Sequence, residues 1–383
     1  MSIAAQQDQI YVPTIILKVS SQCNLACEYC VSTDLLKKKS LMSIDLFSQI
    51  LSNFVPYFAK KGFTDLELVF HGGEPLLAGH EFYRKIPELE SAIDTADLLI
   101  YKTIQTNGTL IAEDWIELLK QGKYRIGLSV DGPAALHDRY RKDHHGKPTF
   151  NRVAQSIEML QEENIPLGLL SVVTESSPPY CNSFFDLLME WNISSIDLLP
   201  CIGPSGWKHT SAYSIFARNF FDKWLENDFP FHVLTFLDIL RKIGGEQAKL
   251  CDFAEMCGKF LFIDTLGRIY PCDECIGDEK YHIGTVSLSS FELDEYRQDR
   301  LQKRRFPACP GCAVNSICSG GCPTVGDANT GRDLYCSARK ALILHILHKI
   351  QEYFLSPKEI LQRFDRKTIQ RVDTVQWTNA ITF

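Results

Sequence analysis

Hydrophobic residues in the first half of the chain follow two alternating patterns. Six short runs rich in apolar and β-branched residues have the length of buried strands, and the segments between them place an apolar residue every three or four positions. The first such segment carries Leu46, Ile50 and Phe54 on one helical face. The predicted strands are residues 14–20, 65–73, 98–108, 124–132, 166–174 and 195–202.

Strands that alternate with helices predict a parallel sheet whose crossover connections are right-handed. We therefore expect an α/β fold of six βα units, either a barrel or an open sheet. In both architectures, ligands bind at the carboxyl ends of the strands. Residues that directly follow a predicted strand are therefore the first candidates for a functional site.

The pattern changes after residue 201. Two helices are predicted at residues 211–228 and 231–245, the second ending at a glycine pair, and a turn-rich segment with many cysteines follows them. Leu342, Ile346 and Ile350 share one face of a closing helix. The predicted divisions are an N-terminal extension at 1–13, a core at 14–205, a helical bridge at 206–250, a cysteine-rich domain at 251–338, and a C-terminal helix and tail at 339–383.

The charge and hydropathy of the chain exclude some classes of partner. Its net charge is −7 and its sequence pI is near 5.8, so it has no broad basic surface with which to neutralise phosphates, and we expect no nucleic-acid partner. No apolar run approaches the roughly 20 residues of a membrane helix, and the N-terminus lacks the basic start and apolar core of a signal peptide. These features predict a cytoplasmic protein without a membrane partner.

Cysteine is the one unusual residue type. The chain has 14 cysteines, which apart from Cys181 and Cys201 gather at residues 23–30 and 251–336. Their density is below that of small secreted disulfide scaffolds, and in a reducing compartment clustered thiols more often bind metal or perform chemistry. The sequence therefore favours metal centres over disulfides.

The first cysteine group, Cys23, Cys27 and Cys30, directly follows the first predicted strand. A [4Fe–4S] cluster held only by protein takes four thiolates, so three thiolates leave one iron open to another ligand. A zinc site completed elsewhere and inert buried thiols are the alternatives. The motif CNLACEYC resembles that of the radical S-adenosylmethionine (SAM) superfamily, whose core is a partial (β/α)6 barrel similar to a TIM barrel. The resemblance implies that the open iron binds SAM and that the reduced cluster cleaves SAM to a 5′-deoxyadenosyl radical.

Polar motifs end the next three predicted strands and fit the same resemblance. HGGEP occupies residues 71–75, QTNG residues 105–108 and SVDG residues 129–132. Glycines in the first motif would let a ligand approach the backbone closely. A planar guanidinium suits the SAM carboxylate, and the sequence leaves Arg141 and Arg152 as equal candidates. The other SAM-binding residues implied by the resemblance are Tyr29, Gly72, Gly73, Glu74, Gln105, Asn107, Ser129 and Asp131.

The second cysteine group resembles the SPASM extension of radical SAM enzymes. Its halves read C-x9-G-x4-C from Cys257 and C-x2-C-x5-C-x3-C from Cys309. A zinc ribbon built from the pairs Cys272/Cys275 and Cys309/Cys312 is the alternative, although it would leave the other cysteines of this group unused. The resemblance implies two auxiliary [4Fe–4S] clusters and therefore three clusters in all. Their implied ligands are Cys251, Cys257, Cys272 and Cys322 for auxiliary cluster I, and Cys309, Cys312, Cys318 and Cys336 for auxiliary cluster II. The packing thiols that remain are Cys181, Cys201 and Cys275.

Within that group, the resemblance points to enzymes that modify peptides or proteins, namely anaerobic sulfatase maturases and the maturases of ribosomally made peptides. Asp273, directly after Cys272, stands where sulfatase maturases carry a catalytic base, and an exposed loop carboxylate is the alternative of equal weight. Hydrogen abstraction leaves a carbon radical, which a nearby base and an oxidising cluster can convert to a product by removing a proton and an electron. Oxidation products are therefore expected.

His71 stands where a sulfatase maturase is expected to carry glutamine. The sequence therefore favours a peptide maturase that forms an oxidative cross-link, of the cyclophane or thioether type, in a precursor peptide. The alternatives are a sulfatase maturase that oxidises cysteine or serine to formylglycine and, in another class, a non-catalytic iron–sulfur or zinc-binding scaffold.

The expected partners are a precursor peptide or protein substrate and an electron donor such as flavodoxin or ferredoxin. Because only about 13 residues precede the first predicted strand, a leader peptide would have to be read by the core or by a separate recognition protein.

Overall fold

The computed structural model describes residues 12–31, 39–93, 98–202, 210–254, 257, 260–287, 306–327 and 330–370, with side chains as far as residue 364. Most of the predicted N-terminal extension and the last part of the predicted tail lie outside these residues.

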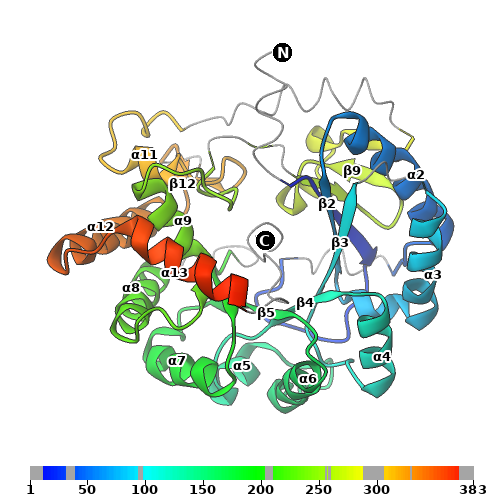
Figure 1. Cartoon of the computed structure of the whole chain (residues 1–383), viewed down its shortest axis with the longest axis horizontal. Coiled ribbons are helices and arrows are strands. Elements are labelled where there is room, and N and C mark those ends of the chain that lie inside the picture. Colours follow the sequence, from blue (N-terminus) through cyan, green and yellow to red (C-terminus); the bar gives the residue numbers. More distant parts are fainter. Residues whose placement is uncertain are drawn as a thin grey trace.

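Six parallel strands form the centre of the main sheet and follow one another in sequence order, so the predicted α/β fold is confirmed. The sheet curves into a partial barrel with helices on its outside (Figure 1). Each strand lies within the run that the hydrophobic pattern predicts. The strands are β1 (Thr14–Ser20), β2 (Asp65–Gly72), β3 (Leu99–Thr106), β4 (Arg125–Ser129), β5 (Leu167–Val173) and β6 (Ser195–Pro200).

The helices between these strands cover the outer face of the barrel (Figure 1). The first, α2 (Ile44–Lys60), begins after Ser43, whose hydroxyl accepts a hydrogen bond from the Leu46 amide at 3.1 Å and so satisfies one free N–H of the first turn. Ile50 and Phe54, on its predicted apolar face, are buried. The other connecting helices are α3 (His80–Ser91), α4 (Glu113–Gln121), α5 (Ala134–Tyr140), α6 (Phe150–Glu162) and α7 (Cys181–Glu190).

Side chains on the two faces of β1 pack in different hydrophobic clusters. Ile15 and Leu17 pack in the hydrophobic core under the helices, whereas Ile16 packs with Val69 in a second cluster inside the barrel. Because side chains alternate along a strand, Lys18 also faces the interior. The interior is thus apolar at mid-height and carries polar groups near the carboxyl ends of the strands.

Strands from the later part of the chain extend the sheet at both edges. β7 (His232–Val233) pairs with β6, and β8 (Phe260–Ile263) pairs in parallel with β1, starting opposite Thr14. The antiparallel strands β9 (Arg268–Tyr270) and β10 (Gly284–Thr285) follow β8. The hydrophobic pattern did not predict these four strands. Through β8, β9 and β10 the cysteine-rich segment continues the barrel sheet.

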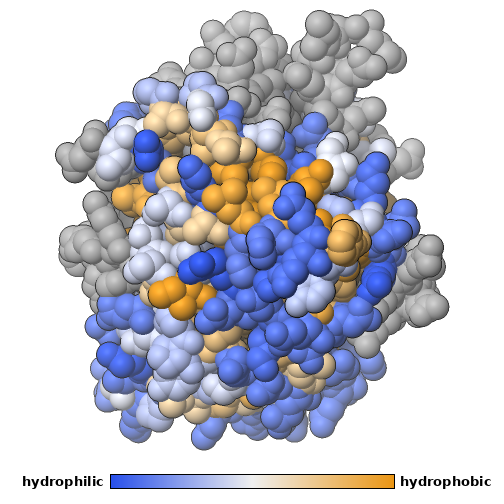
Figure 2. All heavy atoms as spheres, turned by 90° about the vertical axis from the view of Figure 1, so that its left-hand side faces the viewer, coloured by the Kyte–Doolittle hydropathy of each residue, from blue (hydrophilic) through white to orange (hydrophobic). Residues whose placement is uncertain are grey.

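Four further helices lie beside the barrel, in the left half of Figure 1. They are α8 (Thr210–Glu226), α9 (Leu234–Ile243), α12 (Cys336–Glu352) and α13 (Pro357–Gln370). Leu342, Ile346 and Ile350 of α12 are buried, as predicted for the closing helix. Figure 2 shows this side of the molecule, where hydrophobic residues gather in one area among hydrophilic ones. Of the helices described, none is both long and apolar enough to cross a membrane.

Candidate active site

The three-cysteine loop follows β1 and is held by the segment after α5. The Ala26 amide donates to the Lys142 carbonyl at 2.8 Å, and His144 Nε2 lies 2.9 Å from the Cys23 carbonyl oxygen. Residues Leu25 and Asp143 form a further antiparallel bridge between the two segments. The three cysteines are partly exposed. The backbone therefore presents three thiols on one short loop at the rim of the barrel, as the motif requires.

The protein environment alone does not favour the thiolate form of Cys23 or Cys27. Burial, followed by the nearby Glu74 carboxylate, raises the pKa of Cys23 to about 12. Burial also raises the pKa of Cys27 to about 11, although the Arg141 guanidinium acts in the opposite direction. A bound cation such as iron offsets the cost of a desolvated thiolate. This donor set therefore fits a metal cluster better than a free nucleophile.

The glycine motif connects the end of β2 to the end of β1 by a close contact and a hydrogen bond. Gly72 has φ of +141°, and a Cβ at this position would lie 2.1 Å from the Ser20 carbonyl oxygen, so no other residue fits. The Gly73 amide donates to the same oxygen at 2.8 Å. The prediction was that a ligand approaches the glycine backbone closely. At Gly72 the group in close contact is the backbone of β1. Contacts of Gly72 and Gly73 with SAM stay a prediction.

The Glu74 carboxylate is buried and fully engaged by the chain. Its Oε1 accepts from the Leu76 amide at 3.0 Å and from the Thr106 hydroxyl at 2.6 Å, and its Oε2 accepts from the Asn107 amide at 2.9 Å. Burial raises the pKa of Glu74 to about 7 in spite of these bonds. Glu74 thus ties the ends of β2 and β3 together beneath the cysteine loop.

Asp131, just after β4, pairs with one of the two candidate arginines. It accepts hydrogen bonds from Arg141 Nε at 2.8 Å and Nη2 at 3.1 Å, and the Tyr29 hydroxyl donates to it as well. Burial would raise the pKa of Asp131, but Arg141, His137 and Tyr29 together outweigh it, and the net shift is downward. Arg141 also lies over the Tyr29 ring, 5.4 Å from its centroid. A buried cation therefore stands beside the cysteine loop.

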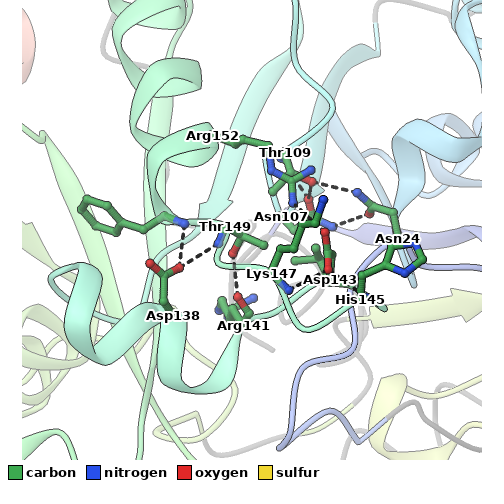
Figure 3. A network of polar contacts seen from close by, with 12 residues as sticks. Asn24, Asn107, Thr109, Asp138, Arg141, Asp143, His145, Lys147, Thr149 and Arg152 are labelled. Atoms are coloured by element: carbon green, nitrogen blue, oxygen red, sulfur yellow. Dashed lines mark hydrogen bonds and ion pairs between the residues drawn. The ribbon is translucent and has the colours of Figure 1, made fainter.

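The structure distinguishes the two arginines that the sequence left equal. Arg141 is 7% exposed, whereas the Arg152 side chain is 44% exposed and lies 3.8 Å from Asp143. Figure 3 shows both arginines around the polar network of this loop. Arg141 is therefore the one that is built into the site.

The Asn107 side chain is hydrogen-bonded to Asn24, the residue that follows Cys23. Its Nδ2 donates to Asn24 Oδ1 at 2.9 Å, and its Oδ1 accepts from the Thr109 amide at 3.0 Å, while Asn24 donates to the Thr109 hydroxyl at 2.8 Å (Figure 3). These bonds hold the cysteine loop against the end of β3. The structure thus places Asn107 beside the predicted cluster ligands.

Gln105 and Ser129 face each other across the interior ends of β3 and β4. Gln105 Nε2 donates to the Ser129 hydroxyl at 3.3 Å, while Gln105 Oε1 is buried without a hydrogen-bond partner. A buried acceptor left unpaired costs about 1–3 kcal/mol. A ligand that carries donor groups, as SAM does, would remove this cost.

The second cysteine group divides between two cavities. A cavity of about 110 Å³ is lined by Cys251, Cys272 and Cys322, and we call it cavity I. A cavity of about 190 Å³, cavity II, lies around α11 (Asn315–Cys318). The cysteines that line cavity II are Cys309, Cys312, Cys318 and Cys336. The sets match those implied for the two auxiliary clusters, except that Cys257 does not line cavity I.

This division bears on the zinc-ribbon alternative. A ribbon needs Cys272 and Cys275 to meet Cys309 and Cys312, but Cys272 lines cavity I while Cys309 and Cys312 line cavity II. Cys275 Sγ lies 3.7 Å from Cys272 Sγ, and Cys275 is buried in the cluster inside the barrel. Cys275 therefore packs as the sequence predicts, and the two pairs do not converge on one ion.

Asp273 lines cavity I next to Cys272 and is partly buried. Burial, with a smaller contribution from Asp252, raises the pKa of Asp273 to about 6. The position of Asp273 in the cavity lining differs from that of an exposed loop carboxylate, and its role as a base stays a prediction.

His71 lies opposite Lys18 in the ladder between β2 and β1. Burial, followed by the positive charge of Lys18, lowers the pKa of His71 to about 4. The imidazole is therefore neutral at physiological pH, at the place where the sequence departs from the sulfatase maturase pattern.

Residues 17–176, from β1 to the turn after β5, match the family model of the radical SAM superfamily. The matched segment contains the three-cysteine loop, the glycine motif and the Asp131–Arg141 pair. This protein is a radical SAM enzyme. Radical SAM enzymes use SAM together with an iron–sulfur cluster, and the three thiols, the buried Arg141 cation and the unpaired Gln105 oxygen fit both groups.

Curated relatives of this radical SAM enzyme match it over most of its length. It is 29% identical over 347 residues to the cysteine-type anaerobic sulfatase-maturating enzyme of Clostridium perfringens (strain 13 / Type A), which covers 85% of this chain and 94% of the relative. It is 26% identical over 371 residues to the serine-type anaerobic sulfatase-maturating enzyme of Bacteroides thetaiotaomicron, with 87% and 88% covered.

Solved structures agree with these relatives. The radical SAM enzyme matches native anSMEcpe with bound AdoMet and Cp18Cys peptide at a TM-score of 0.79 and 26% identity, covering 89% of this chain and 98% of the other. Streptococcus suis SuiB bound to precursor peptide SuiA matches at a TM-score of 0.58 and 16% identity, covering 84% and 74%. The second likeness shows a shared fold alone.

Proposed function

We propose that this radical SAM enzyme is an anaerobic sulfatase maturase, which oxidises a cysteine or serine side chain of a protein substrate to formylglycine. The proposal is supported by the similarity to sulfatase-maturating enzymes over nearly the whole of both chains. The observation that carries it is the position of Asp273, which lines cavity I beside Cys272 instead of lying in an exposed loop. The peptide cross-link that His71 favoured has weaker support, because SuiB shares only the fold.

The residues of the rim would hold the cofactor. When bound, SAM and the cluster at Cys23, Cys27 and Cys30 supply a 5′-deoxyadenosyl radical that removes a hydrogen atom from the substrate. Arg141 would provide a buried cation beside Cys27, and Gln105 Oε1 would offer an acceptor to a ligand amine or hydroxyl. The neutral His71 side chain borders the same rim and would contact the substrate or the cofactor.

The cysteine-lined cavities would hold two further clusters. Cavity II has four thiols, which suffice for a closed [4Fe–4S] cluster. Cavity I has three, and Cys257 is the fourth ligand that the SPASM spacing implies. Clusters closed by four thiolates cannot bind a substrate directly, so they would accept electrons or support the structure.

Asp273 would be the base in this reaction. In the oxidation, the substrate carbon loses a hydrogen atom, the thiol or hydroxyl loses a proton, and one electron leaves to an acceptor. A serine residue becomes the aldehyde directly, whereas a cysteine residue becomes a thioaldehyde that water converts to the aldehyde with release of sulfide. Asp273 would take the proton at the edge of the cavity that would hold the electron acceptor.

The test is a product analysis with two substrates. Reconstituted enzyme, dithionite and SAM are incubated with sulfatase-derived peptides that carry cysteine or serine at the modified position, and the products are examined by mass spectrometry. We expect an aldehyde in at least one of the two peptides. If both peptides stay unmodified while a candidate precursor peptide loses two hydrogens, the enzyme is a cross-linking maturase and the proposal is wrong.

A further inference from the structure

Cavities I and II share one wall. Among the described residues that line them, Asp333 and Arg339 border both cavities. Asp333 ends β12 (Arg332–Asp333), and Arg339 lies in the first turn of α12. Their exposed fractions are only 5% and 6%. A buried pair of opposite charges therefore stands between the two sets of cysteines.

Apart from the bond between its two members, the pair is bonded to residues of cavity I. Arg339 Nη1 lies 3.1 Å from Asp333 Oδ2, and Arg339 Nη2 donates to Asp252 Oδ2 at 2.7 Å. Asp333 Oδ2 also accepts from the Cys322 amide at 2.8 Å, so it fixes the backbone of a cysteine of cavity I. On the other side, Arg339 lies three residues after Cys336 of cavity II. The charged network is thus bonded to the cavity I side, and its guanidinium also lines cavity II.

The chain makes room for this pair at Gly321. A Cβ there would lie 2.2 Å from Arg339 Nη1 and 2.5 Å from Asp333 Oδ2, and the residue has φ of +71°. Both the space and the backbone conformation therefore require glycine at this position. The segment between Cys318 and Cys322 therefore accommodates the ion pair only with glycine at position 321.

The guanidinium carries its charge at every working pH. Burial lowers the pKa of Arg339, but Asp252, Asp333 and Cys318 together raise it well above its ordinary value. Removing one member of such a buried network leaves an uncompensated charge, which is costly. The positive charge is therefore a permanent part of the wall between the cavities.

We propose that Arg339 is a positioning residue for both auxiliary centres, whose positive charge raises their reduction potentials from the shared wall. The inference rests on the auxiliary clusters of the proposed function. Reduction adds negative charge to a cluster, and a nearby cation favours the reduced form. Asp252 borders cavity I alone and lowers the potential on that side.

The test is a redox titration of the reconstituted protein, followed by electron paramagnetic resonance without SAM or peptide. Arg339→Gln should move both auxiliary signals to more negative potentials, and Arg339→Lys should return them toward the wild-type values. Asp252→Asn should move one auxiliary signal to a more positive potential. Arg125→Gln is the matched control, because Arg125 is 7% exposed and borders neither cavity. It should leave both signals unchanged.

Unchanged potentials in an iron-replete Arg339→Gln variant would overturn the inference, as would equal shifts in the glutamine and lysine variants. If Arg339→Gln fails to retain iron, the Asp252→Asn variant becomes the test. The absence of a positive shift in the potential of one auxiliary signal in that variant counts against the inference. Loss of iron from both variants also overturns it, since the network would then serve only to hold the wall. A wild-type protein with only about four irons per chain would instead contradict the auxiliary clusters themselves. Failure to form formylglycine leaves this titration unaffected.

Discussion

Arg141 and Asp131 form a two-pronged ion pair inside the barrel rim, with N–O distances of 2.8 and 3.1 Å. The pair links the end of β4 to the segment that holds the three-cysteine loop. It therefore connects the scaffold of the barrel to the position of the radical centre.

Replacing the carboxylate should damage both stability and cofactor chemistry. In Asp131→Ala the Arg141 guanidinium loses its buried partner, which costs about 3–5 kcal/mol in comparable cases. We expect a loss of this size in the free energy of unfolding, measured by urea denaturation, together with loss of SAM cleavage. Arg152→Ala, at the exposed arginine, is the control and should change stability by less than about 0.5 kcal/mol. Equal effects of the two substitutions would contradict the role given to the pair.

Gly72 should tolerate no side chain. In Gly72→Ala the added methyl group would lie 2.1 Å from the Ser20 carbonyl oxygen, so β1 and β2 must separate at the end that carries the cysteine loop. Gly146→Ala is the matched control, because Gly146 also has positive φ but has open space around it. Gly146→Ala should cost about 1–2 kcal/mol from the backbone alone, and Gly72→Ala clearly more. Similar urea midpoints for the two variants would show that the contact with Ser20 relaxes freely.

Asp197 should make stability depend on pH. It is buried, it accepts hydrogen bonds from Thr235, and burial raises its pKa to about 7. The folded protein therefore keeps a proton that the unfolded chain has lost, and stability should fall as pH rises from 5.5 to 7, by up to about 1.4 kcal/mol per pH unit. Asp197→Asn should lack this contribution. The measurement is urea denaturation of both proteins across this range, and parallel pH profiles would refute the prediction.

Asp273 should matter for product formation and not for SAM cleavage. In Asp273→Asn the substrate would lack its base, so we expect aldehyde formation to fall by about 10²- to 10⁴-fold while 5′-deoxyadenosine still forms. Chromatography of 5′-deoxyadenosine and mass spectrometry of the peptide separate the two steps. Asp278→Asn, a substitution of a partly exposed carboxylate five residues further on, should change neither. If the Asp273 variant forms aldehyde at the normal rate, another group is the base.

The hydrophobic pattern predicted the six strands of the barrel because each contains an uninterrupted run of buried residues between turn signals. It did not predict β8, since the run from Phe260 to Ile263 has only four residues and lies in a turn-rich segment. The resemblance to the SPASM extension implied the four thiols that line cavity II, because its motif fixes their order along the chain. Local sequence patterns are therefore sufficient to predict the barrel strands and the cysteines of cavity II.

Other features of the site have no local signal. The hydrogen bond from the Ala26 amide to the Lys142 carbonyl joins backbone groups, so neither residue type predicts it. Arg141 and Arg152 look alike in the sequence, and only the fold shows that one of them is buried. The preference for a cross-linking maturase rested on His71, a single rim residue, and similarity to sulfatase-maturating enzymes over 85% of the chain outweighs it. Contacts made across the fold thus decide what spacing alone leaves open.

The most direct test of the account is SAM cleavage by Cys27→Ala, with Cys181→Ala as the control for loss of a buried thiol. Under dithionite, the wild-type protein and Cys181→Ala should produce 5′-deoxyadenosine, whereas Cys27→Ala should produce none and should retain about 8 of about 12 irons per chain. Cleavage at the wild-type rate by Cys27→Ala would contradict the assignment of the three-cysteine loop as the radical centre.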